Sequence, residues 1–116
     1  MATMERPRIA RTYSRHGRDA VTVLGQQIRI NRLDRKLSVA QLAERVGVSR
    51  DMMQRIELGD PRCAIGLVFE AATIVGLPLF GEDRGKLTLL VSEQAEKLRL
   101  LPKAVRKTQV VVKDDF

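Results

Sequence analysis

Residues 38–58, SVAQLAERVGVSRDMMQRIEL, contain two short runs of helical periodicity with a glycine between them. Leu42 and Val46 are four positions apart on one face of the first run, and Met53 and Ile56 are three positions apart on one face of the second. Gly47 falls between the runs, where a left-handed backbone conformation costs glycine little. The stretch therefore predicts two helices joined by a tight turn.

Two further positions complete this pattern. Ala43 falls where the two helices would cross, so a small side chain is needed there, and Val48 fills the corner between them. A helix, a tight turn and a second helix at this spacing are typical of a DNA-binding helix-turn-helix, whose second helix enters the major groove. The predicted core of the motif is Leu42, Ala43, Val46, Gly47, Val48, Met53 and Ile56.

Helical spacing predicts three more helices, so the expected fold class is all-α with five helices. The first covers residues 19–36, and the carboxylate of Asp19 complements the helix dipole near its start. Its inner face carries Leu24, Ile28 and Asn31, and its outward face carries Arg29, Arg32 and Arg35.

Capping residues mark the starts of the next helices. Ser38 and Gln41 form a capping box for the second, and Ser49 caps the third, with Asp51 in its first turn. The fourth helix, residues 65–75, begins after Ala64, which has no side-chain acceptor. Its expected buried residues are Ile65, Val68, Phe69, Ala72 and Val75.

The last part of the chain is apolar on more than one side. A fifth helix over residues 86–100 aligns Leu87, Leu90, Val91, Ala95 and Leu98, whereas Leu89 and Leu100 fall off that stripe. Such a helix packs against a second copy or another subunit, unless the two leucines are simply exposed singly. The following tail contains the β-branched run 110–112, which is either disordered or pairs as a short strand with a partner.

The charge of the chain favours a polyanionic partner. Its formal net charge is +7 and its pI is about 10.3, with five arginines and one acid in residues 1–18. That arm is either a solvated terminus or a segment that follows phosphates or enters a minor groove. We divide the chain into a basic arm (1–18), a helix-turn-helix domain (19–81), a C-terminal helix that forms a dimer or partner surface (82–101) and a tail (102–116).

Catalysis and membrane insertion are not expected. The single cysteine, Cys63, is predicted to be a small buried hydrophobe, and no metal-ligand spacing, phosphate-binding loop or nucleophile elbow occurs, so we expect no enzyme and no cofactor. The longest apolar stretch, residues 64–80, is at the short limit for a membrane span and contains Glu70, Gly76 and Pro78. Without a signal peptide, the expected location is the cytoplasm.

The third helix would read DNA through its outward side chains: Arg50, Asp51, Gln54 and Arg55. An arginine can donate two hydrogen bonds to guanine, and a glutamine can pair with adenine. Each such contact gives about 1–3 kcal/mol of discrimination against the wrong base. Asp51 either accepts from cytosine or orients Arg55, four residues along, and we favour orientation.

The starts of the second and third helices, at Ser38 and Ser49, can hold phosphates through their backbone amides. Arg29 and Arg32 on the first helix are expected to contact phosphates as well. One motif reads only a few base pairs, so we expect a homodimer on a palindromic operator whose half-sites lie about 34 Å apart.

The stretch LSVAQLAERVGVSRDMMQRIELG resembles the lambda/Cro repressor-type (Xre) helix-turn-helix, over about residues 22–80. The seven core residues satisfy the family pattern, and Glu57 and Gly59 match its usual ending. The resemblance implies a lambda-repressor-like domain. Val39 and Lys36 depart from the family, which often has a phosphate-binding glutamine and a helix-closing glycine there.

Within that family, RIELGDPRCAIGLVFEAATIVGLPLF followed by a basic tail is similar to HipB-type antitoxins. This resemblance implies a homodimer that represses its own operon and binds a HipA-type kinase toxin, or leaves neutralisation to a third protein. The closest alternative is a stand-alone prophage or metabolic repressor without a toxin partner. A different class would be an interaction module in which the helix-turn-helix serves as a scaffold.

Overall fold

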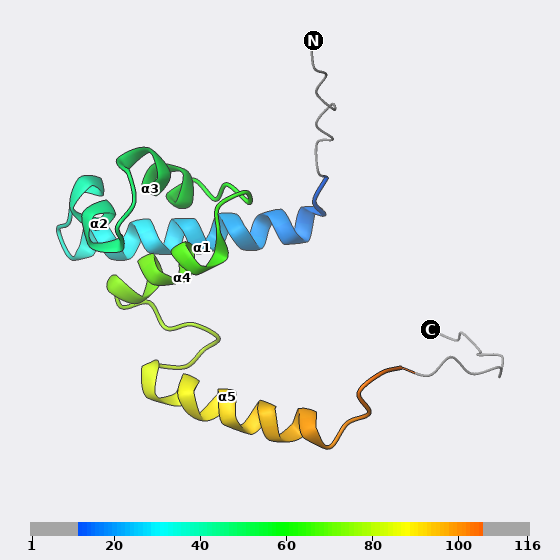
Figure 1. The fold of residues 1–116 in the computed structure, drawn as a ribbon. Coiled ribbons are helices and arrows are strands. Elements are labelled where there is room, and N and C mark those ends of the chain that lie inside the picture. The colour runs from blue at the N-terminus through cyan, green and yellow to red at the C-terminus, as the bar shows by residue number, and fades with distance from the viewer. Residues whose placement is uncertain (1–11, 106–116) are drawn as a thin grey trace, which may run out of the picture. The chain divides into compact units, whose positions relative to one another are not determined.

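The computed structural model describes residues 12–105 of the chain. It confirms an all-α fold, with no β-sheet within that range. The chain forms two compact units that divide after Phe80 (Figure 1). The first unit contains α1 (Arg15–Asp34), α2 (Val39–Val46), α3 (Arg50–Glu57) and α4 (Ile65–Ile74), and the second contains α5 (Arg84–Arg99). The predicted tail strand and most of the predicted arm lie outside the described residues.

The first helix begins at Arg15, four residues before the expected start at Asp19. Ser14 caps it, because its hydroxyl oxygen accepts the backbone N–H of Gly17 at 3.0 Å. Residues 15–18, predicted to belong to the arm, are therefore helical. The prediction missed this cap because it located the helix start from the carboxylate of Asp19.

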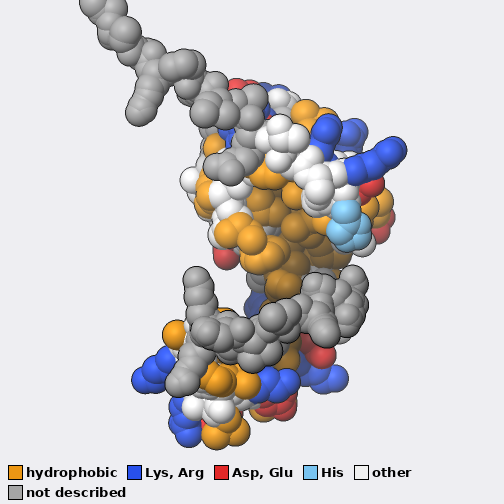
Figure 2. Space-filling view, turned by 90° about the vertical axis from the view of Figure 1, so that its right-hand side faces the viewer, with side chains coloured by type: hydrophobic (Ala, Val, Ile, Leu, Met, Phe, Trp, Pro, Cys, Tyr) orange, Lys and Arg blue, Asp and Glu red, His pale blue; other side chains and the backbone are white. Residues whose placement is uncertain are grey.

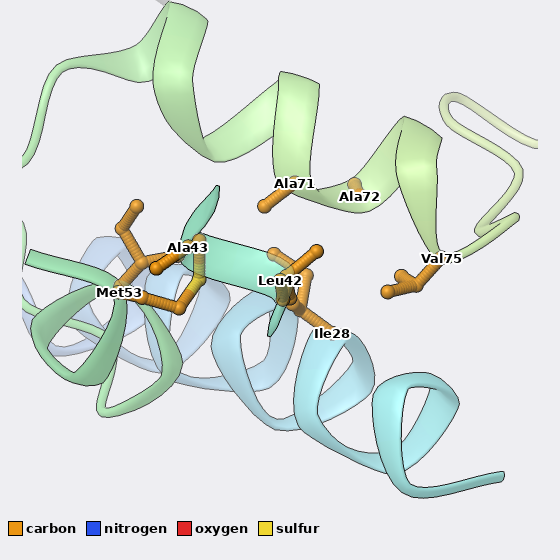
Figure 3. Packing of buried hydrophobic residues seen from close by; sticks show 8 residues of the cluster. Ile28, Leu42, Ala43, Met53, Ala71, Ala72 and Val75 are labelled. Carbon is orange, nitrogen blue, oxygen red and sulfur yellow. The ribbon is translucent and has the colours of Figure 1, made fainter. Parts of the chain in front are cut away.

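The core of the first unit is assembled from all four of its helices (Figure 3). Leu42 of α2 lies beside Ile28 of α1, and Ala71 and Ala72 of α4 face them from the other side. Within residues 12–105 no aromatic ring is fully buried, in keeping with the expectation of an aliphatic core. The buried hydrophobic residues are Ile28, Leu42, Ala43, Met53, Ile56, Ala71, Ala72 and Val75.

The buried face of α4 differs from the expected one. Ala72 and Val75 are buried as predicted, and Val68 and Phe69 are half-buried. Ile65 was predicted to be buried, but its side chain is 69% exposed, and Ala71, which was not predicted, is completely buried. Two adjacent alanines let α4 pack closely against α1 and α2, which a face of larger side chains would prevent. As expected, Ala64 provides no side-chain cap at the start of this helix.

Helix α3 lies unusually close to α1. A Cβ atom added to Gly25 on α1 would be 2.6 Å from the carbonyl oxygen of Ile56, and one added to Gly59 would be 2.7 Å from Cα of Thr22. Both neighbours are backbone atoms, which cannot turn away as a side chain could. Glycine at these positions therefore sets the distance between the two helices.

A buried ion pair joins the same two helices. Nε and Nη2 of Arg32 on α1 donate to the two carboxylate oxygens of Glu57 on α3, at 2.6 and 2.9 Å. Nη1 of Arg32 donates to the carbonyl oxygen of Leu37 at 2.8 Å. The two side chains are only 7% and 6% exposed, so neither charge has water as its main partner. This fork fixes the orientation of α3 about its own axis relative to α1.

Two polar features of α1 follow from its neighbours. Asn31 is a polar residue on the otherwise apolar inner face of α1. Its side-chain nitrogen donates to the carbonyl oxygen of Val75 at the end of α4. Lys36, where the family often has glycine, takes the left-handed conformation that glycine would adopt, with φ = 56°. The chain turns here through bonds from Lys36 N–H to Leu33 and from Leu37 N–H to Arg32, as in a glycine-terminated helix.

Helix α5, described by itself, has no buried residue. Asp83 caps it by accepting the backbone N–H of Lys86. Figure 2 shows hydrophobic side chains at the surface of this segment, among Lys, Arg, Asp and Glu side chains. The large exposed hydrophobic residues here and in the turn that follows are Leu89, Val91, Leu98, Leu100, Leu101 and Val105.

The close approach at Gly25 leads to a stability prediction. We expect Gly25→Ala to lower the free energy of unfolding by about 1–3 kcal/mol, because two helix backbones must move apart to admit the methyl group. Gly66→Ala on α4 is the matched control, since a Cβ atom added there would have nothing within 4 Å. It should leave stability unchanged or raise it by up to about 1 kcal/mol through helix propensity. Urea unfolding followed by circular dichroism measures both, and equal stabilities would contradict the close contact.

A second prediction concerns the Arg32–Glu57 pair. Arg32→Met or Glu57→Leu alone should cost about 3–5 kcal/mol of stability, because each leaves an unpaired charge in the core. The double variant removes both charges, so it should be more stable than either single variant. It loses only the bond from Arg32 to Leu37, whose removal costs about 1 kcal/mol. A double-mutant cycle of unfolding free energies checks this, and additive losses would show that the two charges do not depend on each other.

Candidate nucleic-acid interface

The structure brings the predicted motif together as two helices and a turn. Helices α2 and α3 pack against each other, and Gly47 between them has φ = 89°, which is the left-handed conformation expected there. Val46 and Val48 are half-buried against the core, and the other four predicted core residues are buried: Leu42, Ala43, Met53 and Ile56. The motif geometry predicted from spacing alone is confirmed.

The four predicted base-contacting side chains are all exposed on α3: Arg50, Asp51, Gln54 and Arg55. They are exposed because Met53, Ile56 and Glu57 occupy the buried face of this short helix. Two guanidinium groups, an amide and a carboxylate offer donors and acceptors of the kind that read base edges in a major groove. Their contact with DNA remains a prediction.

The two predicted serine sites are helix caps. The hydroxyl oxygen of Ser38 accepts the N–H of Gln41 at 3.0 Å, and that of Ser49 accepts the N–H of Met52 at 3.0 Å. Gln41 completes the capping box by accepting the N–H of Ser38 at 2.8 Å. Each cap uses the serine oxygen as an acceptor, so its O–H can still donate to a phosphate oxygen.

The expected outward position of Arg32 is wrong. Its guanidinium is turned inward onto Glu57 and the carbonyl of Leu37, so Arg32 is not a free side chain that can reach out to a phosphate. Three-residue spacing from Arg29 suggested one common outward face, but the acid on α3 that captures Arg32 is 25 positions away in sequence. Arg29 is exposed, as predicted, and its phosphate contact stays a prediction.

A hollow of about 300 Å³ lies where α1, α2 and α3 meet. It brings Arg29, a predicted phosphate contact, to the same place as Gln54, a predicted base contact. Val39, which stands where the family often has glutamine, forms part of its apolar wall. The complete lining is Arg29, Arg32, Val39, Gln54, Glu57 and Leu58.

One polar cluster of this region was not predicted. No role was predicted for Asp60, but it accepts hydrogen bonds from the backbone N–H of Arg62 at 2.9 Å and from its guanidinium at 3.0 and 2.9 Å. Arg62 thereby holds the pKa of the Asp60 carboxyl far below its ordinary value. An aspartate two residues before an arginine was the available signal, since an aspartate often accepts the backbone N–H two residues on.

Asp60 also changes the interpretation of Arg55. The favoured expectation was that Asp51 orients Arg55, but the ion pair that Arg55 makes within residues 12–105 joins its Nε to Oδ2 of Asp60, at 3.5 Å. The orienting carboxylate thus comes from the loop after α3 and not from the preceding turn. Asp51 has its exposed carboxylate available for other partners.

Thiol and metal chemistry find little support in the described part of the chain. Cys63 is half-buried and packs against the core, and burial raises the pKa of its thiol. Residues 12–105 contain no group of three or more His, Cys, Asp or Glu side chains arranged to hold a metal ion. No helix in this range has the length and apolar character to cross a membrane.

Comparison with known proteins identifies the family of the central part of the chain. A family model described as "Helix-turn-helix domain" matches residues 23–86, which is more than half of the 116-residue chain. No curated protein and no solved structure matches the chain. The matched range contains α2, α3 and α4 completely, together with the part of α1 that packs against them. The chain therefore belongs to the helix-turn-helix domain family, as a DNA-binding regulator of the Xre/Cro type.

Proposed function

We propose that the protein is a sequence-specific repressor that acts as the HipB-like antitoxin of a toxin–antitoxin operon. It binds a palindromic operator as a homodimer, represses its own operon, and binds a HipA-type kinase toxin. The observation that carries the DNA-binding part is the exposed face of α3, which presents four base-reading side chains from a helix fixed by the core.

The surroundings of α3 support major-groove binding. The capped starts of α2 and α3 provide free backbone amides and serine hydroxyls for phosphates, and Arg29 is exposed beside Gln54 at the same hollow. The buried fork between α1 and α3 holds the helix at a constant angle. A rigid helix with phosphate contacts on both sides suits direct readout of bases.

The dimer and partner part of the proposal is supported by α5. This helix carries exposed leucine and valine side chains, an apolar surface of the kind that a second polypeptide covers. A two-fold dimer also supplies the second reading helix that a palindromic operator requires. The similarity of residues 55–80 to HipB-type antitoxins supports a kinase toxin as the additional partner.

We expect Arg50→Ala/Arg55→Ala to weaken binding to the protein's own promoter at least about 30-fold. Two lost base contacts of about 1–3 kcal/mol each account for this change. A footprint on the promoter locates the operator. Fluorescence anisotropy then measures Kd between 50 and 300 mM salt. The logarithm of affinity should fall linearly with the logarithm of the salt concentration, with a slope of about −0.9 for each phosphate that the protein neutralises.

The matched control is Arg84→Ala/Arg99→Ala, which removes the same charge from α5. It should lower affinity far less, because these arginines lie on α5 and not on the two helices of the motif, α2 and α3. Unchanged operator binding by the Arg50/Arg55 variant would refute base reading by α3.

We expect the purified protein to be a homodimer through α5, and a kinase-sized product of the adjacent gene to co-elute with it after co-expression. Val91→Glu/Leu98→Glu introduces charges among exposed apolar residues of α5 and should shift the protein to monomer. Thr88→Glu/Ser92→Glu adds the same charge at polar positions of the helix and should leave the dimer intact. Size-exclusion chromatography with light scattering measures the mass of each species.

Two outcomes would overturn parts of this proposal. A dimer without any co-eluting kinase favours the stand-alone repressor. An unchanged dimer in the Val91/Leu98 variant would show that another surface mediates dimerisation.

A further inference from the structure

The loop after α3 contains an acid between two arginines that point outward. The carboxylate of Asp60 is only 13% exposed, whereas the side chains of Arg55 and Arg62 are 45% and 77% exposed. Arg62 binds it with a fork, Nε to Oδ1 and Nη2 to Oδ2, and Arg55 approaches Oδ2 from the helix. The acid therefore lies beneath two guanidinium groups that remain accessible.

The backbone of this loop is fixed by the end of α3. Gly59 is left-handed with φ = 78°, its N–H donates to Ile56, and the N–H of Asp60 donates to the carbonyl of Arg55 at 3.0 Å. These two bonds form the glycine-terminated helix end known as a Schellman motif. Asp60 is thus held in register with the last turn of the recognition helix, and its carboxylate has a defined direction.

The backbone contact of Asp60 does not require its negative charge. The loop needs one side-chain oxygen to accept the N–H of Arg62, and an asparagine would provide it. The second carboxylate oxygen serves only the two arginines. On a protein with net charge +7 that binds a polyanion, an acid here weakens general attraction to DNA, and the contacts that its charge makes are those with the two arginines.

We propose that Asp60 is a specificity-determining positioning residue, which holds Arg55 in the direction for base reading and Arg62 in the direction for the neighbouring phosphate. This inference rests on the proposed DNA-binding function and identifies a residue that acts through its neighbours. A free arginine can swing between adjacent bases and phosphates, whereas an arginine tied to a fixed carboxylate presents its donors to one place. Asp60 lowers the affinity for non-specific DNA and raises the discrimination between sequences.

Asp60→Asn tests this, because it keeps the loop acceptor and removes the charge. The wild type first selects its preferred site from a random duplex pool, and Kd is then measured on that site and on a scrambled duplex of equal length. We expect the ratio of specific to non-specific affinity to fall about tenfold, with relaxed preference at the base that Arg55 reads. Affinity for the scrambled duplex should rise, because one repulsive charge is lost.

Two further variants separate positioning from charge. Glu70→Gln on α4 removes an equal charge at an exposed position and should raise both affinities while leaving their ratio unchanged. Arg62→Lys keeps the charge, but a lysine cannot form the two-pronged contact with Asp60, so the ratio should fall. Thermal unfolding should show all three variants folded, within a few degrees of the wild type.

The outcomes are distinct. A wild type that selects no sequence refutes the proposed function itself. A wild type that selects a site, with Asp60→Asn choosing the same site at the same ratio, overturns the positioning role. A ratio that falls equally in Glu70→Gln would assign the effect to net charge alone and also overturn it.

Discussion

The contact between α1 and α3 is the constraint on which the rest of the structure depends. Gly25 lets the carbonyl end of α3 rest directly on the backbone of α1, and the Arg32–Glu57 fork fixes the angle at which it does so. Helix α3 is only eight residues long, which is too short to be stable as an isolated helix. Its position and its very existence as a helix come from this contact and from the core on its other side.

Because α3 is held from within, its outward side chains are free for recognition. The buried ion pair illustrates the division of roles among the arginines of this domain. Arg32 is buried in the interior. Replacing a buried ion pair with apolar side chains often costs no free energy of unfolding, so the main contribution of Arg32 is to define the orientation of α3 relative to α1. Arg50 and Arg55 remain exposed, and Asp60 restrains one of them from the loop side.

Sequence reasoning succeeded where the determinants are local. The core of the helix-turn-helix, its glycine turn and the caps at Ser38 and Ser49 depend on residues at most a few positions apart, and spacing alone identifies them. It failed where the partner of a side chain is distant in sequence, and where the burial of a residue depends on how its helix packs. Arg32 is buried because of an acid on another helix, and Ile65 is exposed at the first position of α4, although Ala72 farther along the same stripe is buried. Periodicity could not reveal the Asp60–Arg62 pair, because the loop has no repeating face.

The absence of a fully buried residue in α5 has a consequence for how this segment behaves at different concentrations. A helix of 16 residues with no buried residue is only marginally stable by itself, so we expect a partner that covers its apolar side chains to raise its helical content. Folding of this segment then becomes a part of assembly, coupled by mass action. At low concentration the first unit can persist while the second frays, which would expose α5 to proteases and give the uncomplexed protein a shorter lifetime than the assembled one.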